Sequence, residues 1–355
     1  MSNLSPSALN YFALVGKIDP VSEIKNAGLL TSGKVVWVKD PSDADYVAFK
    51  DAVGSDDNFS DTIQGAIDKC TSDQNDVVLV CPKISGTAWT MTTGIDLNKN
   101  RVHLISVGYN PTLPGTAGYS NTIQGFGTSN TSVPDTYGLL TLTGHGCEVA
   151  GFRFVGTAGT ALLGSVGADG GTGGLITIES NGNWIHDVAI ERRGAAWDAG
   201  TPAALIMAGS THSGQKFDNV FINAGTQTAS DVSAVKLPQS GLDWEFSNCK
   251  FVKTGIATTD NPIKAAGGTA DGIHATFENC SFVNHAGTAP DGVVGGSMPV
   301  GSFILMKNCM AVGITTFGTG AGVKVVPSFA GGTINNLLQN PGIAIPGTAL
   351  IVTKT

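Results

Sequence analysis

Residues 246–251 read Phe-Ser-Asn-Cys-Lys-Phe, and residues 277–282 read Phe-Glu-Asn-Cys-Ser-Phe. Both follow one pattern: an apolar residue, any residue, then Gly, Asp or Asn, and then an apolar residue, any residue and a final apolar residue. Further copies start at residues 149, 185, 217 and 306, and a decayed copy starts at residue 334, so that neighbouring starts lie 28 to 36 residues apart. A period in this range indicates a solenoid of stacked repeats rather than a closed globular domain.

The third position of each copy holds a residue type that adopts positive φ readily. Gly has no Cβ, and the short polar side chains of Asn and Asp can bond to the local backbone. Each copy therefore predicts a strand bent at one left-handed residue. The predicted bends are Gly151, Asp187, Asn219, Asn248, Asn279, Asn308 and Asn336. Apolar side chains on both sides of the bend are expected to point inward and to stack on the next coil at about 4.8 Å.

A short apolar or alternating segment precedes each bend and predicts a second strand in every coil. These segments are Leu175–Ile178, Ala204–Met207, Ala234–Leu237, Pro262–Ala265, Val293–Val294 and Val323–Val326. Gly- and Thr-rich stretches of variable length join them, and the 48 glycines suit many tight corners. Crossover connections between parallel strands are almost always right-handed. The sequence therefore predicts an all-β fold, a right-handed, single-stranded parallel β-helix.

A short helix is expected just before the coils. Between Asp61 and Cys70 the apolar residues recur at helical spacing, and Asp61 and Gln64 are spaced as a capping box. The segment Val77–Val80 then reads as a buried strand. Because the open end of a solenoid exposes its core and its strand edges, this helix is expected to cap the N-terminal end.

Residues 1–58 fit no predicted coil. They carry the aromatic segments Tyr11–Val15, Val35–Val38 and Tyr46–Phe49 in a stretch too short to bury them well alone. We expect a small module that docks on another protein, and packing on the flank of the chain's own helix is the alternative. The expected organisation is a docking module at 1–58, a capping helix and β-helix at 59–340, and a C-terminal tail or cap at 341–355.

Three of the six cysteines, Cys249, Cys280 and Cys309, take the same place in successive copies. They predict a column of small buried thiols, with disulfides between neighbouring coils as the alternative. The first residues show no basic stretch followed by a sustained apolar run, so we expect synthesis in a reducing cytoplasm. No apolar segment approaches the length of a membrane span, and no membrane association is expected.

The charge of the chain argues against a nucleic-acid partner. The net charge is −8 and the pI is about 5.1, whereas binding to phosphates needs clustered Lys and Arg. Arg192 and Arg193 are the one adjacent basic pair in the sequence, and we expect them in a solvated turn.

The predicted helix, the Val-Leu-Val-Cys-Pro run at 78–82 and the Asn-Cys-x-Phe copies resemble pectate-lyase-like right-handed β-helix proteins over residues 59–340. The N-terminal half resembles virion proteins of tailed bacteriophages that are encoded near capsid genes. This resemblance implies a structural virion protein, a homotrimeric decoration or protrusion on the capsid exterior. Residues 1–58 would attach it to the major capsid protein or another virion protein, with the coils pointing outward.

Two alternatives stay open. Members of the β-helix fold cleave polysaccharides, so a tailspike-like protein that cleaves or binds host surface glycans is the main competitor. Glycoside hydrolysis needs two carboxylates about 5 to 10 Å apart, and a lyase needs a base with a nearby cation. A secreted adhesin is the third possibility, and the apparent lack of a signal peptide disfavours it.

One ionisable cluster could supply an acid, a base and a cation. It comprises His186, Asp187, Glu191, Arg192, Arg193 and Asp198. Asp187 already has a structural role at a predicted bend, however, and Asp198 is expected in a loop. We therefore predict no catalytic residues.

Other motifs give no stronger sign of chemistry. Gly144-His145-Gly146 matches one element of the polygalacturonase pattern, but the rest of that pattern is missing, so we expect a turn. The run 56–58 lacks the Gly and the Glu of a calcium loop. The histidines are never closely paired, and neither a Cys-x-x-Cys motif nor a nucleotide-binding fingerprint occurs in the sequence. We predict no metal and no cofactor.

Overall fold

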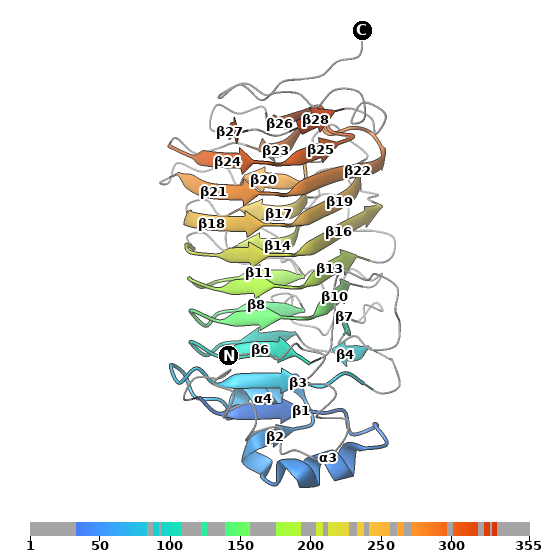
Figure 1. Cartoon of the computed structure of the whole chain (residues 1–355), viewed down its shortest axis with the longest axis vertical. Helices are drawn as coiled ribbons and strands as arrows, with labels where there is room; N and C mark the ends of the chain where they lie inside the picture. Colours follow the sequence, from blue (N-terminus) through green and yellow to red (C-terminus); the bar gives the residue numbers. More distant parts are fainter. Residues whose placement is uncertain are drawn as a thin grey trace, which may run out of the picture.

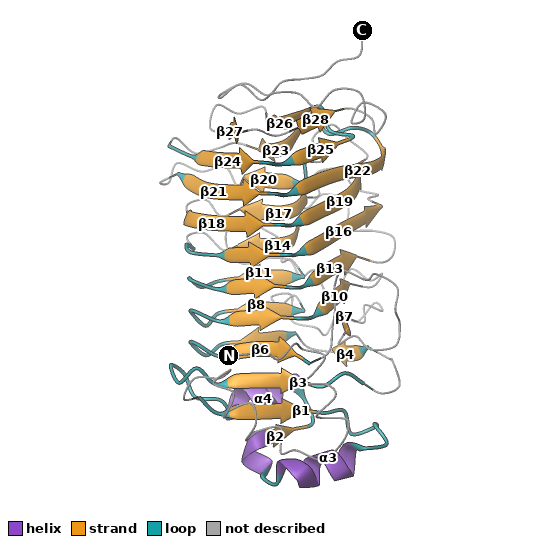
Figure 2. Ribbon diagram, in the orientation of Figure 1, coloured by secondary structure: helices purple, strands orange, loops and turns teal. Residues whose placement is uncertain are grey.

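The chain forms a rod of stacked strands (Figure 1). The computed structural model describes residues 33–83, 88–91, 94–107, 122–125, 139–156, 175–192, 204–208, 212–226, 233–237, 241–255, 261–265, 272–296, 301–318, 323–326 and 329–331. Within this part of the chain, helices lie at the N-terminal end of the rod and strands make up the rest (Figure 2).

The strands form three sheets, which we call sheets A, B and C. Sheet A has 11 strands in the order β2 (Phe59–Ser60), β1 (Val35–Val38), β3 (Val77–Val80), β6 (His103–Ser106), β9 (Glu148–Ala150), β12 (Trp184–His186), β15 (Lys216–Asp218), β18 (Gly241–Ser247), β21 (Ile273–Glu278), β24 (Phe303–Lys307) and β27 (Val323–Val326). Sheet B has nine strands, β4 (Trp89–Met91), β7 (Thr122–Gly125), β10 (Arg153–Gly156), β13 (Ala189–Arg192), β16 (Phe221–Thr226), β19 (Lys250–Gly255), β22 (Ser281–Gly287), β25 (Met310–Val312) and β28 (Phe329–Gly331). Sheet C has eight strands, β5 (Ile95–Leu97), β8 (Leu140–Leu142), β11 (Ile176–Ile178), β14 (Ala204–Ala208), β17 (Ser233–Leu237), β20 (Ile263–Ala265), β23 (Gly292–Gly296) and β26 (Thr316–Gly318).

From β3 to β26, each coil adds one strand to each sheet in the order A, B, C. One coil contains β9, β10 and β11, and these strands pair in parallel with β12, β13 and β14 of the next coil. This connectivity is that of a parallel β-helix, as the sequence predicted. Its right-handed sense still rests on the crossover rule.

The predicted second strands coincide with sheet C for five of the six segments. The exception is Val323–Val326, which is β27 and pairs with β24 in sheet A. The next strand of sheet B is β28, and it pairs with β25. The predicted seventh copy, which starts at residue 334, lies outside the described residues.

The bends between sheets A and B lie where the sequence placed them. The φ angles are 78° at Gly151, 52° at Asp187, 53° at Asn219, 57° at Asn248, 55° at Asn279 and 53° at Asn308. Six predicted bends are thus confirmed, and Asn336 lies outside the described residues. Because the left-handed conformation is costly for most residues, the Gly, Asp or Asn at this position is explained by the backbone.

A second column of left-handed residues marks the corner that leads into sheet A, and the sequence analysis did not predict it. Its members are Arg101, Gly146, Gly182, Gly214 and Asp243, with φ angles of 53°, 65°, 72°, 69° and 58°. Each lies two residues before one of the register-matched positions His103, Glu148, Trp184, Lys216 and Glu245. Each of the coils that start at β9, β12, β15 and β18 is therefore turned by two left-handed corners.

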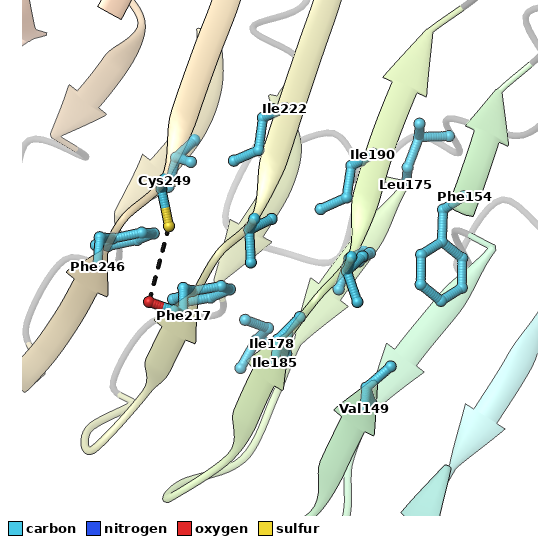
Figure 3. Packing of buried hydrophobic residues seen from close by; sticks show 14 of the residues in the cluster. Val149, Phe154, Leu175, Ile178, Ile185, Ile190, Phe217, Ile222, Phe246 and Cys249 are labelled. Atoms are coloured by element: carbon cyan, nitrogen blue, oxygen red, sulfur yellow. Dashed lines mark hydrogen bonds between the residues drawn. The ribbon is translucent and has the colours of Figure 1, made fainter. Parts of the chain in front are cut away.

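Inward-facing side chains of neighbouring coils stack on one another in the core (Figure 3). The rings of Phe217 and Phe246 lie 4.5 Å apart with an interplanar angle of 3°, and those of Phe246 and Phe277 lie 4.5 Å apart at 6°. Phe251 and Phe282 repeat this arrangement on sheet B, at 4.7 Å and 11°. These separations match the spacing between strands, so parallel pairing itself brings the rings together.

All six cysteines are buried and free, so the alternative of disulfides is not realised. Cys249, Cys280 and Cys309 each follow a bend, and their thiols contact backbone carbonyls of the preceding coil at 3.3 to 3.7 Å, as drawn for Cys249 in Figure 3. Hydrogen bonding between neighbouring thiols, together with burial, raises the pKa of Cys280 and Cys309. Cys280 and Cys309 therefore form the thiolate less readily, and a thiol reacts as its thiolate.

The predicted helix is α4 (Ile63–Lys69), and its Ile63, Ala66 and Ile67 side chains are buried in the main core. The predicted capping box is wrong: Thr62 is the N-cap, and its hydroxyl accepts a hydrogen bond from the Gly65 amide. Gln64 instead faces β5, the strand at the N-terminal edge of sheet C. Its Nε2 donates to the Asp96 carbonyl at 3.2 Å, and its Oε1 accepts from the Asp96 amide at 2.8 Å. The side-chain amide thus binds the strand edge as another strand would.

The prediction that residues 1–58 fit no coil is wrong for Val35–Val38. These residues form β1, which pairs in parallel with β3. Val36 and Val38 are buried in the main core, while Trp37 faces the other side of sheet A. There α3 (Tyr46–Val53) covers it, with Phe49 packed edge-on against Trp37 at 5.5 Å. Residues 35–60, including the short helix η1 (Asp56–Asn58), are therefore packed on the rod; a docking role for residues 1–32, which lie outside the described residues, stays a prediction.

Candidate functional site on the outer face of sheet A

A chain of ionisable side chains crosses three neighbouring coils on the outer face of sheet A. Glu148 in β9 lies between two histidines from the adjacent strands: its Oε2 is 3.2 Å from His103 Nδ1, and its Oε1 is 2.8 Å from His186 Nε2. The other ring nitrogen of His186, Nδ1, is 2.9 Å from Asp187 Oδ2. Asp187 Oδ1 then accepts a hydrogen bond from Asn219 Nδ2 at 2.6 Å. We call His103, Glu148, His186 and Asp187 the histidine–carboxylate chain.

The charges in this chain support one another. Burial opposes the ionised form of Glu148, but the hydrogen bonds and positive charge of His103 and His186 outweigh burial and lower its pKa to about 2. Burial likewise opposes the charged form of His186, yet Glu148 and Asp187 outweigh it and raise the pKa of His186. The result is an ionised Glu148 carboxylate beside His186, and each of these two groups favours the charged form of the other.

Trp184 borders the histidine–carboxylate chain on the same face. Its indole stacks on the His186 ring with centroids 4.0 Å apart and an interplanar angle of 27°, and it is 40% exposed. Lys216 of the next coil places its Nζ 5.8 Å from the centroid of the indole. The chain and Trp184 therefore combine ionised groups with a partly exposed aromatic surface.

The ionisable cluster that the sequence suggested is divided between two sheets. His186 lies on sheet A and Asp187 at the bend that follows it, whereas Glu191 lies on sheet B and binds Arg153 of the preceding coil. Arg153 Nε donates to Glu191 Oε1 at 2.8 Å, and Arg153 Nη2 donates to Glu191 Oε2 at 2.7 Å. This two-point contact is the strongest geometry for a carboxylate–guanidinium pair. The side chain of Arg192, together with Arg193 and Asp198, lies outside the described residues.

His145 lies in a turn, as expected for the Gly-His-Gly motif. The turn contains Gly146 at a φ of 65°, and His145 Nδ1 accepts a hydrogen bond from the backbone amide of Asn181 at 3.0 Å. Its carbonyl accepts from the amide of Arg101 at 2.8 Å. His145 thus connects the turns of adjacent coils.

The sequence analysis missed His103 and Glu148. Glu148 and Trp184 each directly precede a copy of the repeat, so alignment of the copies places both in one outward-facing column. His103 belongs to a coil that lacks a copy, and its register with Glu148 comes from the pairing of β6 with β9. A search for ionisable residues close in sequence cannot find groups separated by a whole coil.

The described residues offer no group of three His, Cys, Asp or Glu side chains arranged to hold a metal ion. Within the same ranges, neither α-helix has the length and apolar character needed to cross a bilayer.

Strand pairing and the two corner columns define the class of this protein, a three-sheet parallel β-helix. Comparison of its sequence with protein families and with curated proteins gives no match. Among solved structures, pectate lyase Pel9A is similar with a TM-score of 0.38 and 10% identity, over 84% of this chain and 80% of that chain. The ORF18 protein of Geobacillus virus E2 is similar with a TM-score of 0.27 and 13% identity, over 76% of this chain and 58% of that chain. These similarities are too low to bear on function.

Proposed function

We propose that the chain is a non-enzymatic structural protein of a tailed-phage virion, a capsid decoration or protrusion protein whose β-helix projects outward. The observation that carries this proposal is that the ionisable side chains are paired with one another. Glu148, His186 and Asp187 bind one another across coils, and Glu191 binds Arg153. Groups held in this way stabilise a rod, whereas a general acid or base must exchange its proton with a substrate. The virion setting comes from the resemblance of the N-terminal half to phage virion proteins.

The attachment region is proposed to lie within residues 1–32. Val35–Val38 are buried in the rod, and Tyr46, Phe49 and Val53 pack against its outer cluster. The segment Tyr11–Val15 carries the aromatic and apolar residues suited to a protein interface. Its proposed partner is the major capsid protein or another virion protein on the capsid exterior, after synthesis in the host cytoplasm.

Deletion of residues 1–32 tests the attachment. We expect the shortened protein to melt at nearly the parental temperature, because the deletion spares every residue that the structure describes. We also expect it to be absent from particles assembled in its presence, as measured by sedimentation and electron microscopy. Normal decoration by the shortened protein would show that attachment lies elsewhere.

The self-association that we propose is a homotrimer. Light scattering on the purified protein should give three times the chain mass of 36.2 kDa. The mass of a monomer, unchanged over a wide range of concentration, would exclude this part of the proposal.

The second candidate function is a tailspike-like protein that binds or cleaves host polysaccharide. It is favoured by the partly exposed indole of Trp184 next to Glu148 and His186, because aromatic rings provide stacking surfaces for sugars. We expect no oligosaccharide to be released from host capsular or lipopolysaccharide material. Release that is lost in Glu148→Gln, in a variant that is still folded at the assay temperature, would replace our proposal with this second function.

A further inference from the structure

The position of His186 between two carboxylates determines its protonation. Glu148 Oε1 and Asp187 Oδ2 lie 2.8 and 2.9 Å from its two ring nitrogens. A neutral imidazole carries one N–H and one lone pair, whereas an ionised carboxylate only accepts hydrogen bonds. Both contacts are hydrogen bonds only when both ring nitrogens carry a proton, so the geometry is that of an imidazolium ion.

The stacking of Trp184 supports the same protonation state. The indole lies nearly parallel to the His186 ring at 4.0 Å, and the face of an aromatic ring attracts a cation. His186 therefore has carboxylates at both nitrogens and an electron-rich ring on one face.

The remaining charged groups around His186 come from the two neighbouring strands of sheet A. On β9 the facing group is Glu148, with His103 of β6 behind it. On β15, Asp218 is in register with His186, and Lys216 extends over Trp184. Asp218 also accepts a hydrogen bond from Asn248, and Lys216 approaches the indole rather than the imidazole. Carboxylates thus predominate around His186.

We propose that the histidine–carboxylate chain is a proton-dependent clamp between coils: protonated His186 ties β9 to β12 and holds the left-handed corner at Asp187, and loss of this proton releases it. The corner is included because Asp187 binds His186 through one oxygen and Asn219 of the next coil through the other. After deprotonation, one ring nitrogen presents a lone pair to a carboxylate oxygen, and attraction becomes repulsion.

The direction of the pH dependence of stability follows from the pKa shifts of His186 and Glu148. The pKa of His186 is raised above its ordinary value of 6.5, so its contribution to stability is complete below that pH and is lost as the pH rises through the raised value. The pKa of Glu148 is lowered from 4.5 to about 2, so its contribution is complete above pH 4.5 and is lost as the pH falls toward 2. The clamp is therefore complete between pH 4.5 and 6.5 and opens on the alkaline side.

Thermal melting of the full-length protein as a function of pH tests the clamp. We expect His186→Gln to melt several degrees below the parent at about pH 5.5, and the difference to fall to less than half by about pH 9.5. The matched control is His274→Gln, on the same outer face in β21, where removal of the exposed imidazole should change the melting temperature little. A His186→Gln difference that is constant with pH, or that grows toward alkaline pH, would refute the proposal.

If His186→Gln does not fold, the wild-type protein still provides a test. The chain has six histidines, and their ring C–H resonances can be followed by NMR after selective labelling. One resonance, shifted by the ring current of Trp184 and moved in Trp184→Phe, should titrate above pH 6.5. If this resonance titrates at or below pH 6.5, the proposal of a clamp is refuted.

Discussion

At the scale of single residues, one left-handed residue at a corner turns the chain from one sheet to the next. Successive coils can therefore stack on one another. Those same positions also join the coils through their side chains. Asn219 donates to Asp187 at 2.6 Å, and Asn248 donates to Asp218 at 2.9 Å. An Asn at the bend therefore serves both the backbone, by tolerating positive φ, and the neighbouring coil, by offering an amide.

Replacement of Asn279 by Val tests the backbone part of this explanation. Asn279 has a φ of 55° and an exposed side chain, whose Nδ2 donates to Asn248 Oδ1 at 3.5 Å. Val and Gly both remove this contact, so the difference between the two variants reports the strain at the bend. A β-branched residue held at positive φ should lower the free energy of unfolding by about 1 to 3 kcal/mol. Chemical denaturation measures the loss, and Asn279→Gly is the control that should keep most of the stability. Equal stability of the Val and parent proteins would mean that the bend is not under this constraint.

The bends could be predicted from sequence because the left-handed conformation restricts a single position to Gly, Asp or Asn. This restriction recurs at the same position in every copy. The corner that leads into sheet A left a weaker mark. Gly146, Gly182, Gly214 and Asp243 lie three residues before the start of a copy, but the copies at 277 and 306 have His274 and Phe303 at this offset, and Arg101 belongs to a coil without a copy. Glu148 and His103 were missed for a related reason: their chemistry depends on register across coils, which only the pairing of strands supplies.

At the scale of elements, the strands are too short to persist alone. β9 and β12 have three residues each, and their stability comes from the coils above and below. The first strand of each sheet lacks a neighbour on one side, so its edge must be covered. At β5, the side-chain amide of Gln64 binds the backbone of Asp96.

Substitution of Gln64 by Ala should loosen the N-terminal end of the rod. It leaves the amide and the carbonyl of Asp96 without the Gln64 side chain, a loss of about 1 to 3 kcal/mol. Hydrogen exchange should become faster at Asp96, while exchange in β20 stays as in the parent. Asp68→Ala is the control, because it removes the second hydrogen-bond partner of Gln64 and leaves the contacts with β5. Unchanged exchange at Asp96 in Gln64→Ala would show that the edge is protected by another group.

The phenylalanine stack is the second element that can be tested. Phe246 contacts the rings of both Phe217 and Phe277, so Phe246→Ala removes the centre of the stack and opens a cavity. We expect the free energy of unfolding to fall by about 3 to 5 kcal/mol, and by less in Phe246→Leu. Phe303→Ala is the control on the outer face, where the ring is 40% exposed and its removal should cost little. A loss in Phe246→Ala no larger than in Phe303→Ala would place Phe246 outside the core.

At the scale of the whole molecule, each coil contacts the coils directly above and below it. Residues 246–276 form one repeat, from the start of one copy to the start of the next, which is 277 − 246 = 31 residues. Their deletion joins Glu245 to Phe277, and the new junction repeats the original sequence of Glu245 followed by Phe. Because Phe246 and Phe277 are in register, inward positions stay inward after the deletion.

We therefore expect the protein without residues 246–276 to fold into a shorter rod with a cooperative melting transition. Stability in a solenoid is approximately a sum over coils and their interfaces, so the melting temperature should fall only modestly. Small-angle scattering should show the rod shortened by about one strand spacing, ~4.8 Å. The control removes residues 246–260, about half of a coil, and joins a strand of sheet A to a segment from another part of the coil. The inward and outward sides of the joined segments then no longer match, and we expect aggregation. If both deletions unfold alike, the coils are not interchangeable units, and the stability of the rod depends on contacts beyond neighbouring coils.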